Sequence, residues 1–114
     1  MEQGRTISFV WRAILERYDF LEAIGFVRTR AGLRAQGIKM EADVDIMSSG
    51  NGLSFRTANI SYDCPAEREW PSPIRANGAV MRRLAPKLEG ERVTLTYAEG
   101  ALILNSTRIP AREL

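Results

Sequence analysis

Histidine is absent from this chain of 114 residues, and cysteine occurs once, as Cys64. Without histidine the protein lacks the commonest general base and the commonest transition-metal ligand, which argues against an enzyme. A single cysteine cannot form a disulfide within the chain, and no second cysteine is present to share a zinc ion. We therefore interpret Cys64 as a small buried residue and expect a non-catalytic protein without a cofactor or metal ion.

Long hydrophobic runs are absent as well. No apolar run approaches the roughly 20 residues that span a bilayer, and the N-terminal "MEQGRTISFVWR" lacks the basic-then-apolar order of a signal peptide. We expect a cytoplasmic protein that does not enter a membrane. The composition, 45% hydrophobic and 26% charged, is typical of globular chains, and the length predicts one domain over residues 1–114.

Lysine is scarce, since only Lys39 and Lys87 accompany 14 arginines in a chain of net charge +2. A GC-rich genome is one explanation, and contact with phosphate, which the guanidinium group matches, is the other. The most basic window is "FVRTRAGLRAQGIK", which contains no acidic residue. It contributes Arg28, Arg30 and Arg34 as candidates for contact with DNA or an acidic partner, and a solvated loop or short strand and turn is the alternative.

The spacing of apolar residues predicts a first helix over residues 11–24, with Gly25 as its C-terminal cap. The preceding "TISFV" has the composition of a short strand. From Met40 onward apolar and polar residues alternate, which predicts a strand, and "SSGNG" supplies the turn into a second extended run, "LSFRTANISYDC". The apolar phase of this run changes near Ala58, which indicates a bulge or the start of a new strand.

The segment "PAEREWPSP" is punctuated by proline and cannot be a central strand. We interpret Trp70 within it as a residue that covers the edge of the core. The alternative is an exposed residue that contacts a protein partner.

A second helix is predicted from about Gly78 to Leu88, with Asn77 as its N-cap. Pro86 removes an amide donor, so we expect this helix to be short or kinked. Its exterior is wholly basic and consists of Arg82, Arg83 and Lys87. The segment "VTLTYAEGALILNSTRIPA" then alternates on both sides of the turn "AEG", which predicts a hairpin.

The predicted order is strand, helix, several antiparallel strands, helix and hairpin. Each half is a helix followed by strands with a glycine-containing turn, which is a weak internal repeat in element order. We expect an α+β fold in which two short helices pack on an antiparallel sheet in two half-repeats.

Residues 73–111, "PIRANGAVMRRLAPKLEGERVTLTYAEGALILNSTRIPA", resemble one domain of the DNA sliding clamps, the ring-shaped processivity factors. In that family a short helix of the type "pa-x-x-L-x-x-x-x-x-x-L" precedes a "VTL" strand, a turn and a "g-x-L-x-I" strand. The matching positions are Ala79 or Val80, Leu84, Leu88, Val93, Thr94, Leu95, Gly100, Leu102 and Leu104. For residues 5–70 the resemblance rests on element order.

The resemblance implies a clamp-like fold in which helices face double-stranded DNA and sheets form the outer wall. It also implies rings of six such domains, closed by pairing of edge strands between subunits, so that this chain would act as six self-assembled copies or as a lone module. Arg82, Arg83 and Lys87 become candidates for non-specific contact with DNA phosphates. The implied function is that of a non-catalytic, DNA-associated accessory module or self-assembling scaffold.

The first helix departs from this pattern, because Arg12 and Arg17 share its exterior with Glu16, Asp19 and Glu22. Only the second helix therefore has the charge of a DNA-lining surface.

Two other classes of function stay open. One is a small protein-binding adaptor of unrelated α+β fold, acting through Trp70 or a sheet edge. The other is a metal-dependent enzyme, in which Glu41, Asp43 and Asp45 alternate onto one face of a strand and hold Mg²⁺. A solvated strand face is the simpler interpretation of those carboxylates.

Overall fold

The computed structural model describes residues 11–35, 43–58 and 61–114. They form an α+β fold dominated by β-structure, with a nine-stranded antiparallel sheet, a separate two-stranded hairpin, two short α-helices and one 3₁₀ turn. The α+β class expected from the sequence is confirmed, with a larger sheet than expected. The strand predicted at residues 6–10 and the start of the alternation at Met40 lie outside the described residues.

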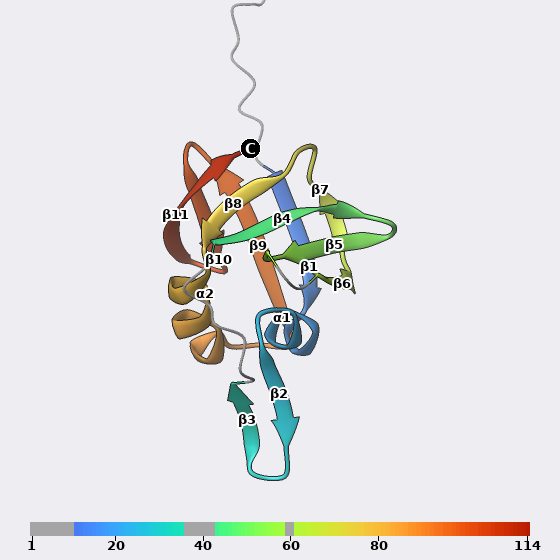
Figure 1. The fold of residues 1–114 in the computed structure, drawn as a ribbon, viewed down its shortest axis with the longest axis vertical. Helices are drawn as coiled ribbons and strands as arrows, with labels where there is room; N and C mark the ends of the chain where they lie inside the picture. The colour runs from blue at the N-terminus through green and yellow to red at the C-terminus, as the bar shows by residue number, and fades with distance from the viewer. Residues whose placement is uncertain (1–10, 36–42, 59–60) are drawn as a thin grey trace, which may run out of the picture.

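The chain divides into two halves that begin in the same way, with a strand that leads directly into a seven-residue helix (Figure 1). The first half contains β1 (Trp11–Glu16), α1 (Arg17–Ala23), β2 (Phe26–Thr29), β3 (Gly32–Ala35), β4 (Asp43–Ser49), β5 (Gly52–Arg56), β6 (Ser61–Pro65) and β7 (Glu67–Glu69). The second half contains β8 (Ile74–Asn77), α2 (Gly78–Leu84), the 3₁₀ turn η1 (Ala85–Lys87), β9 (Arg92–Ala98), β10 (Ala101–Leu104) and β11 (Thr107–Glu113).

The first helix is shorter than predicted, because residues 11–16 form strand β1. Trp11, Ala13 and Leu15 alternate into the core, and β1 pairs with β9 over its whole length and with β7 on its other edge. This pairing satisfies backbone groups on both sides of the strand, so long-range contacts outweigh the helical spacing of the apolar residues. The helix ends before Gly25, whose φ of 98° agrees with the predicted cap.

The second helix follows its prediction closely. The Asn77 side-chain oxygen accepts a hydrogen bond from the Val80 amide at 2.9 Å, which is the expected N-cap. The α-helix ends at Leu84, and Pro86 lies in the 3₁₀ turn that follows it. Proline therefore shortens this helix, as its missing amide predicts.

The C-terminal hairpin extends to a three-stranded meander. Glu99 and Gly100 connect β9 to β10 with positive φ values of 47° and 77°, the backbone conformation of a tight hairpin turn. A second turn at Asn105, whose φ is 57°, leads into β11. The predicted hairpin is confirmed, and its last residues form a third strand.

The large sheet curls on itself. Its strand order is β6-β5-β4-β8-β11-β10-β9-β1-β7, and the two end strands, β6 and β7, are separated in the chain by Ala66 alone. Figure 1 shows β8, β4 and β5 crossing in front of β9 and β1. The core lies between these layers and under the helices. Its largest fully buried side chains include Phe20, Leu21, Ile24, Ile46, Leu53, Ile74, Met81, Leu95, Leu102 and Leu104.

Strand pairing repeats between the two halves. β1 pairs with β9, the strand after the second helical segment, and β8 pairs with β4, the strand that begins the first meander. Strands β4-β5-β6 form one meander and strands β9-β10-β11 form another. After the first meander β7 pairs with β1, and at the end of the second meander the last residues of β11 pair with β8. Exchanging the halves reproduces the pairing pattern, so the repeat seen in element order extends to the sheet. The β2–β3 hairpin has no counterpart in the second half.

Candidate nucleic-acid interface

Both helices lie at one end of the curled sheet, and the β2–β3 hairpin projects from the same end (Figure 1). Arg17, at the start of α1, connects the two helical segments: its Nη1 donates a hydrogen bond to the Leu88 carbonyl at 3.1 Å, and its amide donates to the Glu91 carbonyl at 2.8 Å. We call the surface formed by α1, α2, η1 and this hairpin the helix end. The sequence does not predict these contacts of Arg17 with Leu88 and Glu91, because its spacing places Arg17 on the exterior of a longer helix.

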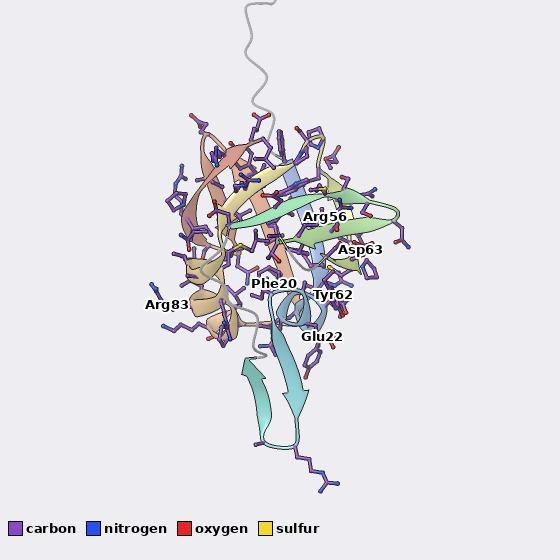
Figure 2. The ribbon with its side chains drawn as sticks, viewed as in Figure 1. Phe20, Glu22, Arg56, Tyr62, Asp63 and Arg83 are labelled. Atoms are coloured by element: carbon purple, nitrogen blue, oxygen red, sulfur yellow. The ribbon has the colours of Figure 1, made fainter. Side chains whose placement is uncertain are left out.

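The predicted basic exterior of α2 is present at the helix end. Met81 and Ala85 are fully buried and hold one side of the helical segment in the core. On the other side Arg83 and Lys87 are exposed, and Arg82 is half-buried. Figure 2 shows Arg83 pointing away from the body of the protein.

Residues 26–35 of the most basic window form the β2–β3 hairpin, which is the strand-and-turn alternative and not a loop, and residues 36–39 of the window lie outside the described residues. Arg28 lies on β2, Arg34 on β3 and Arg30 in the turn between them, where it is exposed. The structure therefore brings two basic segments, separated by about half the chain, to the same end of the fold (Figure 1).

The exterior of α1 is mixed in charge, as expected. Glu22 is exposed, and its Oε1 accepts a hydrogen bond from the Tyr62 hydroxyl at 3.3 Å (Figure 2). Partial burial, together with the Glu22 charge and this hydrogen bond, raises the pKa of Tyr62. Tyr18 is 46% exposed, and the Arg17 guanidinium lies 6.0 Å from the centre of its ring. The helix end thus presents the aromatic side chain of Tyr18 beside its charges.

Trp70 lies in the core, with 4% of its surface exposed. Its indole N–H donates to the Ile46 carbonyl at 3.1 Å, and its ring makes an edge-to-face contact with Trp11 at a centroid distance of 5.9 Å. The interpretation of Trp70 as a residue that covers the core is confirmed. The alternative of an exposed partner-contact residue is wrong, because both the polar and the aromatic parts of the side chain are occupied inside the fold.

The acidic strand is β4, and Arg75 is bound to one of its two carboxylates. Asp45 accepts two hydrogen bonds from Arg75, at 2.6 Å from Nε and 3.0 Å from Nη2, and this contact raises the pKa of Arg75. Asp43 is exposed at the start of the strand, and Glu41 lies outside the described residues. Among residues 11–35, 43–58 and 61–114, no three or more acidic or cysteine side chains are placed to hold a metal ion.

Cys64 is 4% exposed on β6, as expected for a buried residue. Burial, with smaller contributions from Asp19 and Asp63, raises the pKa of its thiol to about 12. Because the thiolate is the reactive species, we expect native protein to react with iodoacetamide at pH 8 at least about a hundredfold more slowly than unfolded protein. Equal labelling rates for the two states would contradict this assignment.

The same shift predicts a loss of stability at alkaline pH. The unfolded thiol ionises near pH 9 and the folded thiol near pH 12, so its contribution is complete below pH 9 and is lost as the pH rises between these values. Urea unfolding at pH 8 and at alkaline pH measures the loss. A Cys64→Ala variant should lose less stability than the wild type over the same interval.

The helix end therefore gathers the α2 cations, the arginine-bearing hairpin and Tyr18, and its only described acidic groups on α1 are Asp19 and Glu22. Neither helix among the described residues has the length and apolar character needed to cross a bilayer. Comparison of the chain with protein-family models and with curated protein sequences finds no match in either.

Proposed function

We propose that this protein is a non-catalytic, sliding-clamp-like module that associates with double-stranded DNA by contact with its phosphates. The observation that carries the proposal is that two strand–helix–meander halves place both helices and the basic hairpin at one end (Figure 1). In the sliding clamps that residues 73–111 resemble, the helices are the elements that face DNA. Here α2 carries a basic exterior, whereas the exterior of α1 is mixed in charge.

The charge of the helix end supports phosphate contact. It contains six candidate cations, namely Arg82, Arg83 and Lys87 on the α2–η1 segment and Arg28, Arg30 and Arg34 on the hairpin. Arginine and lysine neutralise phosphates without reading bases, so we expect binding that is independent of sequence and weakens steeply with salt.

The acidic residues of α1 limit the expected affinity. Asp19 and Glu22 lie on the same end and oppose the approach of a phosphate backbone. We therefore expect a dissociation constant for a single copy within the usual non-specific range, on the order of 10⁻⁴–10⁻⁶ M at physiological salt. Neutralising these carboxylates should tighten binding.

A double variant, Arg83→Ala with Lys87→Ala, tests the proposal. Both side chains are exposed, so their removal should leave the fold intact, and the half-buried Arg82 is left in place. Each lost phosphate contact reduces the slope of log affinity against log salt by about 0.9, so the slope should become shallower by about 1.8. Fluorescence anisotropy with a labelled duplex at several salt concentrations measures it.

The matched control is Arg12→Ala with Arg56→Ala, which removes two exposed arginines from strands β1 and β5. It makes the same change in net charge and should alter the salt dependence less. Equal effects of the two double variants would show that net charge and not the helix end governs binding. A wild-type protein that does not bind duplex DNA at low salt would overturn the proposal.

A further inference from the structure

The β2–β3 hairpin stands apart from the rest of the fold. Its two strands form a sheet of their own beside the nine-stranded sheet, and the second half of the chain has no counterpart to it. A two-stranded hairpin by itself is only marginally stable in water, so its position depends on how the body of the protein holds its base.

The base of the hairpin is anchored to the end of α1. The Ile24 amide donates to the Phe20 carbonyl at 3.1 Å, and both of these side chains are fully buried. The Gly25 amide donates to the Glu22 carbonyl at 3.1 Å, and Gly25 then turns the chain directly into β2 with a φ of 98°. The direction of the hairpin is therefore set by a helix end that is held in the core.

The tip of the hairpin is open and narrow. The strands pair as far as Thr29 and Gly32, so Arg30 and Ala31 form the turn. Arg30, Ala31 and Gly32 are all exposed, and a Cβ atom added to Gly32 would have no heavy atom within 4 Å. Ala31 carries only a methyl group and Gly32 only a hydrogen atom. Residues 30–32 therefore present one long side chain, the guanidinium-bearing side chain of Arg30.

The hairpin also extends beyond both helices (Figure 1). Each of its strands has four residues, and at about 3.4 Å per residue the tip lies roughly 10 Å from the base. The grooves of B-DNA are about 7.5–8.5 Å deep. If α2 lies against a phosphate backbone, as proposed above, an element that extends past it over this length enters a groove.

The tip matches the minor groove better than the major groove. The minor groove is about 6 Å wide and the major groove about 12 Å wide. A-tracts narrow the minor groove further and strengthen its negative potential, which attracts an inserted arginine. The segment supports this contact electrostatically, because residues 26–35 contain three arginines and no acidic residue. In the major groove, by contrast, Ala31 and Gly32 would bring no side-chain donor to the base edges.

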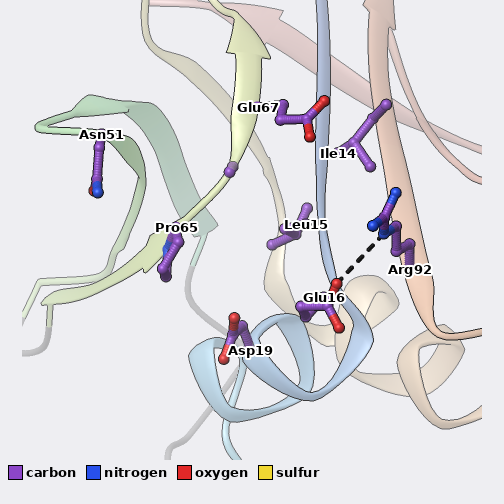
Figure 3. Close-up of a pocket in the computed structure, with 9 residues that line it drawn as sticks. Ile14, Leu15, Glu16, Asp19, Asn51, Pro65, Glu67 and Arg92 are labelled. Carbon is purple, nitrogen blue, oxygen red and sulfur yellow. Dashed lines mark ion pairs between the residues drawn. The ribbon is translucent and has the colours of Figure 1, made fainter.

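An acidic groove beside α1 restricts where the duplex can lie. The groove has a volume of about 310 Å³, and its charged lining residues are Glu16, Asp19, Glu67 and Arg92 (Figure 3). Glu16 and Arg92 form an ion pair at 3.4 Å, so Asp19 and Glu67 give the groove a negative charge. This charge repels phosphates from that side of α1 and leaves α2 and the hairpin as the surface that DNA can approach.

We propose that the hairpin inserts Arg30 into the minor groove of A·T-rich double-stranded DNA, while Arg83 and Lys87 contact the phosphates beside it. This inference rests on the proposed function and adds to it a preference for DNA shape. The phosphate contacts of α2 read no bases and stay independent of sequence, so the preference comes from Arg30.

Three labelled duplexes of equal length test the inference by fluorescence anisotropy. The first has the centre AAATTT, which forms an A-tract, and the second has the centre TTTAAA, which has the same composition but contains a flexible TA step. The third repeats the first with diaminopurine in place of adenine, which adds an amino group to the minor groove and leaves the major groove unchanged. The wild type should bind the first duplex about fivefold or more tightly than the other two.

Arg30→Ala should bind all three duplexes alike. Arg30 is exposed in a turn, so this variant should keep the fold, which circular dichroism checks. The matched control is Arg12→Ala, which removes one exposed arginine from β1 and should keep the preference. Arg83→Ala with Lys87→Ala should bind every duplex more weakly and keep the ratio between them.

The outcomes separate this inference from the proposed function. A wild type that binds the three duplexes equally would overturn the inference and leave phosphate binding intact. A preference that survives diaminopurine or Arg30→Ala would overturn it as well, because the contact would then lie outside the minor groove or on another residue. A wild type that binds no duplex at low salt would overturn both.

Discussion

Replacing Trp70 with alanine should lower the free energy of unfolding by about 3–5 kcal/mol, the range for loss of a large aromatic side chain from a core. Trp70 is 4% exposed and packs against Trp11, so the truncation leaves a cavity in the hydrophobic core. It also leaves the Ile46 carbonyl without the indole N–H that donates to it. Urea unfolding, followed by circular dichroism, measures the change.

Two further variants separate packing from other effects. Trp70→Phe keeps most of the apolar volume and loses the hydrogen bond, so its cost should be clearly smaller than that of the alanine variant. Tyr18→Ala removes an aromatic side chain that is 46% exposed and should change stability by no more than about 0.5 kcal/mol. A Trp70→Ala protein as stable as the Tyr18→Ala protein would contradict the burial of Trp70.

Gly52→Ala should destabilise the fold by about 1–3 kcal/mol or more, because strand β5 passes very close to β6 at this residue. A Cβ atom on Gly52 would lie 1.9 Å from the Cys64 carbonyl oxygen and 2.8 Å from Pro65 Cα. Both are backbone atoms in a paired strand, so neither can move aside without disturbing the β5–β6 pairing. Thermal unfolding of the variant measures the cost.

The matched control for this prediction is Gly50→Asn in the adjacent turn. Gly50 has a φ of 53°, and a Cβ atom added to it would have no neighbouring atom within 4 Å. Asparagine tolerates this backbone conformation better than other residues with a side chain, so we expect a loss of about 1 kcal/mol or less. If Gly52→Ala were as mild as this control, the close approach of β5 to β6 would not exist in solution.

The equivalent of Gly52 in the second half is Ala101, which begins β10 as Gly52 begins β5. Ala101 is buried and carries a Cβ atom without difficulty. The two halves therefore share a pairing pattern but differ in how closely their meanders approach. Divergence of this kind explains why the repeat is visible in element order and not in residue identity.

Predictions that depended on local chemistry were confirmed. Asn77 caps α2, Pro86 ends its α-helical part, and the glycine-containing turns connect the strands on either side of them. These features can be predicted from a few neighbouring residues, because caps and turns depend on the hydrogen bonds and φ preferences of the residues that form them.

The failure at residues 11–16 has the opposite cause. Trp11, Ile14, Leu15 and Tyr18 are spaced as in a helix, yet Trp11, Ala13 and Leu15 also alternate as in a strand. The choice between the two periods came from β7 and β9, which lie more than 50 residues away in the chain. No local pattern contains that information.

The candidate site was predictable in its residues and not in its arrangement. Arg82, Arg83 and Lys87 were identified from the exterior of one predicted helix, and Arg28, Arg30 and Arg34 from a window without acidic residues. Their position at a common end follows from the placement of α1 and α2 at that end of the sheet (Figure 1). The burial of Trp70 could not be settled from its proline-rich surroundings.

By itself the sequence determined the α+β class, the second helix with its cap and its proline stop, the C-terminal hairpin and the charge of each segment. These follow from propensities and periodicities that act over a few residues. Only the tertiary structure decided that residues 11–16 are a strand, that the two end strands of the sheet are joined through Ala66, and that the β2–β3 hairpin and α2 lie at one end of the fold. Each of these depends on which distant strands pair, and strand pairing is chosen by the packing of the whole core.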